Sequence, residues 1–419
     1  MSNKRIAIVL LMVMCNPARA PANSDTGGDV AAPYSPPFVF SAFGTAGAVH
    51  SSEDRADFTG SIFKPNGAGY THSWSTDVDT ILGAQVVAHL TSKLSATFQL
   101  ISLQRYDNTY TPKVEWANLK YQLTPDVSFR VGRIVLPSFL FSDSRNVGYS
   151  NPWVRLPGET YSLVPVSNND GLDASYRLQL GDLTQTLVAT YGRTADNQPQ
   201  GGGSEARNQW VISDTLEYGA ASVHAAYQEA HLTIDSLNTF IDTFRLFGSQ
   251  GAAIANEFDQ ANKPLRFASL GAMYNPGEWF LAGEWGKTEL HSVLGTSSSW
   301  YVSGGYRFGS LTPFVNYAVL TAESPKSNPG VNIALLPPDL VPIALGLNVG
   351  LDSILGSAPT QNTVSLGVRW DFTRDVDLKV QYDHTRVGAG SSGTLTNLQP
   401  GFRPGESFSL LSATIDFVW

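Results

Sequence analysis

Basic side chains recur at the polar positions of segments in which polar and apolar residues alternate. Six of them would face one shared interior if the segments are neighbouring strands: Lys120, Arg130, Arg177, Arg307, Arg369 and Lys379. Fixed cations around a narrow aqueous space attract anions and orient polar molecules through their field. The same residues could instead be ion-paired wall residues, and the sequence leaves both interpretations open.

Residues suited to catalysis are few. The histidines are scattered along the chain, and Asp383 and His384, which are adjacent, would point to opposite faces of a strand. No Gly-x-Ser-x-Gly elbow, phosphate-binding glycine loop or Glu-x-x-His pair occurs. A fold can assemble a catalytic triad without a local sequence signature, so the absence of these motifs is only moderate evidence against an enzyme. We expect no enzyme, no cofactor and no metal site.

The elements that position these residues are strands of about ten residues. The alternation predicts sixteen of them, at residues 38–49, 79–91, 93–106, 113–123, 126–135, 171–180, 183–193, 209–218, 220–232, 265–275, 278–289, 298–308, 311–321, 362–373, 376–387 and 407–419. Ten tilted residues suffice to cross a hydrocarbon layer. In the last strand, Leu411, Ala413, Ile415 and Phe417 alternate with Ser412, Thr414 and Asp416.

The connections between these strands alternate between short and long. Tight turns such as Gly181-Asp182, Gly219, Pro276-Gly277 and Gly309-Ser310 follow the even-numbered strands, and long links follow the odd-numbered ones. This rhythm is typical of an antiparallel membrane-spanning β-barrel, which has short turns at one rim and long loops at the other. Aromatic residues at strand ends, including Trp279, Trp285, Tyr301, Tyr317 and Trp370, fit interfacial belts. A soluble sandwich is the alternative.

The chain begins with a segment typical of export. Lys4 and Arg5 precede a short apolar run, and Ala18, Ala20 and Ala22 follow it, which predicts a signal peptide at residues 1–22. Residues 23–37 would then be a leader and residues 38–419 the barrel. The single cysteine, Cys15, lies in the signal peptide, so the mature chain would form no disulfide. With 36 acidic against 27 basic residues, the chain does not suit nucleic acid.

Two segments in the long links are unusually apolar. Residues 331–355 are interrupted by Pro337, Pro338 and Pro342. They could pack as a loop against the rim or a neighbouring subunit, or could form an extra strand pair that raises the count to eighteen. Residues 234–258 have apolar side chains at helical spacing, which predicts a short surface helix.

These features together resemble the Gram-negative outer-membrane porin superfamily. The similarity rests on the export segment, on Val131-Gly132-Arg133-Ile134-Val135-Leu136-Pro137 before the third long loop, and on the terminal Phe417-Val418-Trp419. Many porins end in Phe, whereas this chain ends in Trp. The resemblance implies that Phe417 and Trp419 form the signal for the outer-membrane assembly machinery. It also implies a homotrimer in outer-membrane lipid.

The resemblance further implies that the third loop, Leu136 to Asp170, enters the barrel and narrows it. An ordinary extracellular loop is the alternative. Loop acids Asp143 and Glu159, with Asp173 on the wall, would then face the six basic residues across a constriction. Tyr149, Trp153 and Tyr161 could form a sliding surface for solutes or could hold the loop in place. We therefore expect a channel for passive diffusion of ions and small hydrophilic solutes. A substrate-selective channel for sugars, carboxylates or aromatic acids and an occluded structural barrel are the alternatives.

Overall fold

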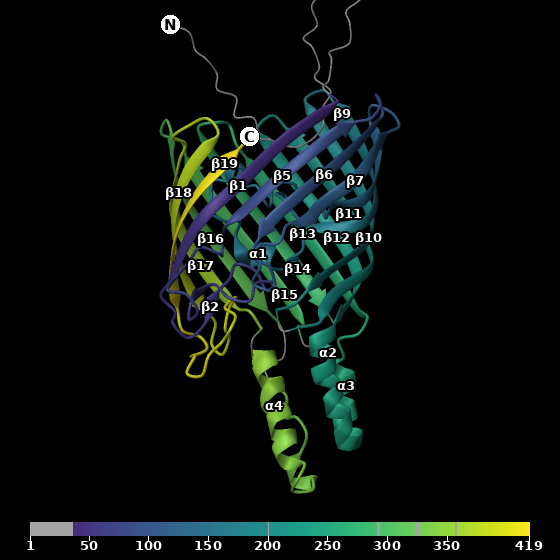
Figure 1. Ribbon diagram of the computed structural model, residues 1–419, viewed down its shortest axis with the longest axis vertical. Coiled ribbons are helices and arrows are strands. Elements are labelled where there is room, and N and C mark those ends of the chain that lie inside the picture. The colour runs from purple at the N-terminus through teal and green to yellow at the C-terminus, as the bar shows by residue number, and fades with distance from the viewer. Residues whose placement is uncertain (1–36, 200, 291–293, 324–326, 357) are drawn as a thin grey trace, which may run out of the picture.

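Sixteen antiparallel strands close into one barrel (Figure 1). The structure is a computed structural model that describes residues 37–199, 201–290, 294–323, 327–356 and 358–419. The strands are β1 (Phe38–Ser51), β5 (Ile81–His89), β6 (Leu94–Leu103), β7 (Lys113–Gln122), β8 (Val127–Val135), β9 (Asn168–Leu180), β10 (Leu183–Asn197), β11 (Gly203–Tyr218), β12 (Ala221–Ile234), β13 (Lys263–Tyr274), β14 (Trp279–Leu290), β15 (Thr296–Tyr306), β16 (Leu311–Ala322), β17 (Gln361–Trp370), β18 (Val376–Val387) and β19 (Phe408–Val418). The predicted signal peptide lies outside the described residues.

The barrel closes where its first and last strands pair. β1 and β19 run antiparallel from Phe43 opposite Val418 to Ser51 opposite Leu410. The sheet therefore has no free edge, which a hydrogen-bonded wall in lipid requires. The sixteen predicted strands are confirmed. The largest difference is at β11, which begins at Gly203 rather than at residue 209.

The two rims of the barrel differ as the sequence predicts. Gly181, Gly219, Gly277 and Gly309 have positive φ angles between 56° and 110° at the tight turns, a region that glycine enters without steric cost. These turns and both ends of the barrel sequence lie at one rim, the short-turn rim, and the long connections lie at the other, the long-loop rim (Figure 1). In the first long connection, β2 (Asp57–Phe58) pairs with β3 (Ala68–Gly69), and β4 (Trp74–Ser75) pairs with β1.

The two faces of the wall also follow the alternation. Val364, Leu366, Leu411 and Ile415 are exposed on the outside, while the polar residues between them face inward and are buried. Tyr301 is an exception to the predicted belt, because its ring faces the interior and is buried. The wall is therefore apolar outside and polar inside, as a barrel in lipid must be.

Helices occur in three of the long connections. Between β8 and β9 lie η1 (Gly148–Ser150) and α1 (Gly158–Tyr161). Between β12 and β13 lie α2 (Asp235–Asp242), η2 (Thr243–Phe247) and α3 (Gly248–Phe258), which confirms the predicted surface helix. Between β16 and β17 lie η3 (Ile333–Leu335) and α4 (Val341–Gly356). Among the described residues, none of the helices has both the length and the apolar character needed to cross a membrane.

The proposed extra strand pair within residues 331–355 is wrong. Ala344, Leu347, Leu351 and Leu355 recur at helical spacing and are buried against residues of η2 and α3, so the segment forms α4 instead. Pro337 and Pro338 precede α4, and Pro342 lies in its first turn, where a missing N–H is tolerated. The segment packs on the other helical connection rather than adding to the wall.

Candidate functional site: loop 3 and the lumen

The connection between β8 and β9, residues 136–167, enters the barrel, and we call it loop 3 (Figure 1). Its Leu136, Phe139, Phe141, Trp153 and Tyr161 form one buried cluster with inward residues of β11 to β16, including Phe267, Phe280, Tyr301 and Phe314. An irregular segment at membrane depth is tolerated where protein surrounds it. The lumen entry of this loop is therefore confirmed, and the ordinary extracellular loop is excluded.

The loop aromatics hold loop 3 against the wall. Trp153 is only 1% exposed, donates from Nε1 to Ser303 at 2.7 Å, and packs edge-on against Phe280 and Tyr301. Tyr149 donates to the carbonyl of Arg374 at 2.5 Å, and the guanidinium of Arg369 stacks over its ring. Trp153 and Tyr161 are buried, whereas Tyr149 is half-buried, and a sliding surface for solutes stays a prediction.

Glu284 on β14 is an anchor for loop 3 that the sequence analysis did not identify. It accepts hydrogen bonds from the Leu140 N–H at 2.9 Å, from the Tyr161 hydroxyl at 2.6 Å and from the Tyr301 hydroxyl at 2.9 Å. Burial and the Glu284 carboxylate raise the pKa of Tyr161 well above its ordinary value, so its hydroxyl remains a donor. An inward acid between Ala282 and Gly286 was visible in the alternation, but its partners were not.

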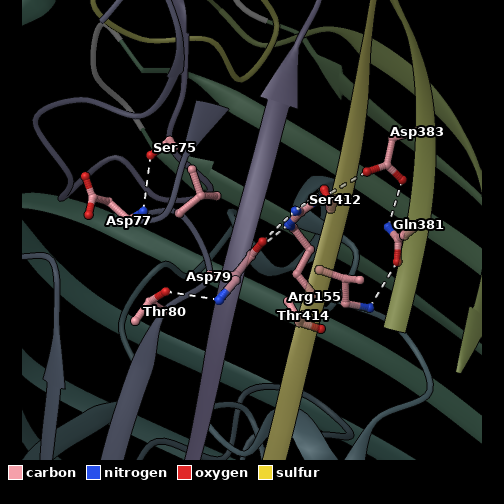
Figure 2. Close-up of polar contacts among 12 residues, drawn as sticks. Ser75, Asp77, Asp79, Thr80, Arg155, Gln381, Asp383, Ser412 and Thr414 are labelled. Carbon is pink, nitrogen blue, oxygen red and sulfur yellow. Dashed lines mark hydrogen bonds and ion pairs between the residues drawn. The ribbon is translucent and has the colours of Figure 1, made fainter. Parts of the chain in front are cut away.

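Arg155 fastens the middle of loop 3 to the opposite part of the wall (Figure 2). Its guanidinium donates to both carboxylate oxygens of Asp79 at 2.9 and 2.8 Å, to Asp383 at 3.0 Å and to the Ser412 hydroxyl at 2.7 Å. Burial alone would lower the pKa of Arg155, but Asp79 and Asp383 raise it above its ordinary value. A planar guanidinium suits such a multiple contact, which a lysine could not reproduce.

Glu159, a predicted constriction acid, lies in the first turn of α1 and is largely buried. Its carboxylate accepts from the Gln361 amide at 2.7 Å and from the Thr363 hydroxyl. The neighbouring Thr160 hydroxyl lies 2.8 Å from that of Ser299 on β15. This end of loop 3 therefore contacts β15 and β17 at once.

Three of the predicted basic residues lie on the wall formed by β7, β8 and β9. Lys120 is in register with Arg130, and Arg130 is in register with Asp173, to which it is ion-paired at 2.7 Å. Arg177 lies four residues beyond Asp173 on β9, nearer the short-turn rim. The predicted loop acid Asp143 is exposed within the lumen and lies within electrostatic range of Arg130. The structure thus brings Arg130, Asp143 and Asp173 together.

The other three predicted basic residues, Arg307, Arg369 and Lys379, form hydrogen bonds and ion pairs with nearby residues. Arg369 is ion-paired with Asp371 at 2.7 Å and Asp377 at 3.0 Å and donates to the Tyr149 and Asn151 carbonyls. Lys379 is fully buried beside Asp416 at 3.1 Å and donates to the Gly148 carbonyl. Arg307 binds Asn275 and the Gly277 carbonyl at a short turn. Their predicted effect on permeating ions stays a prediction.

A cavity of about 1520 Å³ lies between loop 3 and the long-loop rim. Loop residues Arg145, Arg155 and Glu159 line it together with amide and hydroxyl side chains of the wall. The other lining cations were not among the predicted site residues; they are Lys64, Arg105, Lys113, Arg133 and Arg207. The six predicted basic residues do not line this cavity, since they lie nearer the short-turn rim.

The chain terminus completes the wall. Phe417 lies on the outside opposite Gly44, where a side chain on Gly44 would clash with the Phe417 ring. Trp419 is 80% exposed, and its backbone exchanges hydrogen bonds of 2.9 and 2.8 Å with Ala42. The aromatic end is therefore presented at the short-turn rim. Its role in assembly stays a prediction.

Solved structures of outer-membrane proteins are similar to this chain in fold. The anion-selective porin from Comamonas acidovorans matches with a TM-score of 0.53 and 12% identity, over 91% of this chain and 99% of that chain. Salmonella typhi OmpF in complex with daunomycin gives 0.54 and 13%, over 91% and 97%. The trimer form of Vibrio cholerae OmpT gives 0.51 and 10%, over 91% and 99%. No curated protein matches the chain in sequence.

The family assignment comes from the sequence itself. The family model described as Gram-negative porin matches residues 141–390, which is more than half of the chain and extends from loop 3 to beyond β18. Together with the closed sixteen-stranded barrel, this match indicates an outer-membrane channel. The chain belongs to the Gram-negative porin family.

Proposed function

We propose that this porin is a passive channel through which ions and small hydrophilic solutes diffuse down their gradients. The observation that carries the proposal is the seating of loop 3, which narrows the lumen while a cavity of about 1520 Å³ remains above it. Permeation through a wide pore is governed by diameter and by the charges along it. The long-loop rim would face the exterior and the short-turn rim the periplasm.

Ion preference would be set on the wall of β7, β8 and β9. Lys120, Arg130 and Arg177 lie there on neighbouring strands, with Asp143 of loop 3 and Asp173 beside Arg130. Arg369 and Lys379 would act mainly by positioning residues 148–151 of loop 3, since their donors are committed to its carbonyls and to acids. Groups of opposite sign across the lumen would create a transverse field that orients polar solutes.

Single-channel recording in planar bilayers tests the proposal. An ohmic current that no single solute blocks is expected. Block by one sugar, carboxylate or aromatic acid would replace this function with a substrate-selective channel. If correctly folded protein showed no conductance, the alternative of an occluded structural barrel would be supported instead. Liposome swelling with neutral and charged solutes of rising size then gives the pore diameter and the charge preference.

We expect three copies to associate through the outer wall of β1, β5 and β6. Several of its outward positions are small, namely Ala42, Gly44, Ala46, Ala84 and Ala88, although Phe40, Leu82 and Phe98 also face outward. A shallow apolar groove of about 400 Å³ runs beside them. Bulky residues such as Trp285, Trp300 and Tyr317 cover the outside of β14 to β16 instead. Ala84→Trp should therefore weaken the oligomer in unheated gels, whereas Val315→Trp should not.

Export and assembly complete the proposed function. Residues 1–22 would be cleaved on export, and Trp419, with Phe417, would be presented to the assembly machinery. Trp419→Ala should lower the amount of folded barrel in the outer membrane while leaving refolding in detergent unchanged. A reduction of both to the same extent would assign Trp419 to barrel stability instead, because its backbone already pairs with Ala42.

A further inference from the structure

The helix α4 is largely apolar, with Asn348, Asp352 and Ser353 as its polar residues. Ala344, Leu347, Leu351 and Leu355 form its buried face, packed against Phe244, Ile254 and Phe258 of η2 and α3. Successive residues of a helix are 100° apart, so Leu345 and Val349 fall on the opposite half and Ile343 falls at its edge. A largely apolar helix normally buries most of its surface. In this chain only one half is covered.

The uncovered half of α4 is apolar as far as Val349, and Asp352 and Ser353 are exposed beyond it. Ile343, Leu345 and Val349 are 51%, 50% and 64% exposed. A side chain on Gly346, which lies between them, would meet no atom within 4 Å, so the surface has an open notch there. We call Ile343, Leu345, Gly346 and Val349 the α4 outer face. Exposed apolar patches of this kind mark interaction sites more often than single exposed residues do.

The α4 outer face lies well away from the lipid-facing wall. With α2, η2 and α3, the helix α4 forms a projection beyond the long-loop rim, on the side away from both termini (Figure 1). Its sixteen residues extend about 24 Å along the helix axis. The base of the projection adjoins the cavity mouth, since Asp235 lines the cavity. A partner on this face would approach from outside the membrane.

The described surface of the projection is acidic. Its carboxylates are Asp235, Asp242, Glu257, Asp259, Asp339 and Asp352, whereas Arg245 is its one basic residue among those described, and it is already paired with Asp242. Asp352 is exposed three residues beyond Val349 on the helix, and Asp339 lies just before the helix begins. Two copies of this surface would repel one another, which argues against a second copy of the chain as the occupant.

We propose that the α4 outer face docks a cationic amphipathic helix from a protein or peptide outside the cell. The apolar side of that helix would lie along Ile343, Leu345 and Val349, with one of its small residues over Gly346. Its lysines or arginines would lie near Asp339, Asp352 and Glu257. Recognition of this kind places an amphipathic helix on an apolar surface, with flanking charges setting orientation and rate.

Binding of a designed helical probe tests the proposal. The complete protein in nanodiscs of neutral lipid is titrated with a fluorescent peptide of leucine and lysine in helical register, and with its leucine–glutamate counterpart. We expect saturable binding of the lysine peptide that weakens with added salt. The triple variant Ile343→Gln, Leu345→Gln, Val349→Gln should weaken this binding at least tenfold. All three side chains are exposed, so the fold of the projection should be kept.

Matched variants separate the apolar and the charged contributions. Ile62→Gln with Leu398→Gln changes exposed apolar residues of other long connections and should leave binding unchanged. Asp339→Asn with Asp352→Asn and Glu257→Gln should weaken it several-fold, whereas Asp54→Asn in the first long connection should not. Unchanged single-channel conductance in the α4 variants confirms that the barrel is intact.

Three outcomes would overturn the proposal. The first is equal binding of the glutamate peptide, which would remove the role of charge. The second is unchanged binding by the triple glutamine variant, which would place the peptide elsewhere. The third is association of wild-type particles with one another that the triple variant abolishes, with no peptide binding, which would make a second copy the occupant.

Discussion

Loop 3 and the helical projection are long connections of the same barrel that run in opposite directions. Loop 3 turns into the lumen and shares its apolar cluster with the wall, where Glu284, Asp79 and Asp383 bind it. The projection turns outward and shares its core only with another connection. The two differ in their partners, because loop 3 has apolar and polar partners on the inner wall, whereas the core of the projection is formed by connections alone.

The two regions should therefore respond differently to substitution. Contacts of loop 3 are ionic and specific, so removing one should alter current through the channel without unfolding the barrel. Contacts of the projection are apolar burial, so a charge in its core should unfold it without altering the lumen. The following predictions separate these outcomes.

Leu351→Asp should have the largest effect. Leu351 is fully buried in the projection, and an unpaired carboxylate there costs several kcal/mol, on the order of 5. We expect limited proteolysis to cut within residues 327–356 while the barrel keeps its resistance to heat and detergent. Val349→Asp, on the exposed side of the same helix, is the control. Loss of the barrel together with the projection would contradict the separation of the two regions.

Arg155→Ala should release the middle of loop 3. The substitution leaves Asp79 and Asp383, both nearly buried, without their shared cation. This loss destabilises the seated loop by roughly 3 kcal/mol, and by less where lumen water solvates the two carboxylates. We expect noisier single-channel currents and a higher mean conductance. Arg105→Ala removes a cation that lines the same cavity and should change ion preference without the noise. Quiet, unchanged currents from Arg155→Ala would show that loop 3 does not depend on this anchor.

Glu284→Gln should loosen loop 3 to a lesser extent. The substitution keeps the shape of the side chain but removes one acceptor from the three donors, at a cost of about 1–3 kcal/mol. Hydrogen exchange at Leu140 and Phe141 should accelerate. Glu278→Gln, in an exposed short turn, serves as the comparison. No change in exchange at these amides would remove Glu284 from the anchoring role.

Arg130→Ala combined with Arg177→Ala should have the smallest effect, confined to ion preference. Removing two cations from the wall of β7 to β9 should move the reversal potential under a salt gradient toward greater cation preference. Arg307→Ala, at a short turn, should move it less, because its donors bind local carbonyls. An unmoved reversal potential would exclude Arg130 and Arg177 as determinants of ion preference.

Much of the fold could be predicted from the sequence because its signals are local. Alternation along ten residues fixes both the position and the facing of a strand, and the glycines at positive φ angles mark the short turns. The helix within residues 331–355 was not predicted, because the three prolines in this segment argued against a helix despite the helical spacing of Leu347, Leu351 and Leu355. Helical spacing was present, but prolines before the helix and in its first turn do not interrupt it.

The site was harder to predict because its contacts are long-range. Arg155 binds Asp79 and Asp383, which are 76 and 228 positions away. Alternation placed Arg369 and Lys379 on the inner face correctly, yet could not show that Asp377, Asp416 and loop carbonyls surround them. The side of the wall on which a residue lies follows from its own strand, whereas the partners of its side chain depend on how the whole barrel closes.

A disulfide between loop 3 and the wall tests the central claim most directly. Thr160 and Ser299 have hydroxyls 2.8 Å apart, and Cys15, the only natural cysteine, lies in the predicted signal peptide. In the variant Thr160→Cys with Ser299→Cys, oxidation should form the disulfide in the folded barrel and leave single-channel conductance unchanged. Failure of the disulfide to form, or a severalfold change in conductance on locking, would contradict a loop seated in the lumen of an open channel.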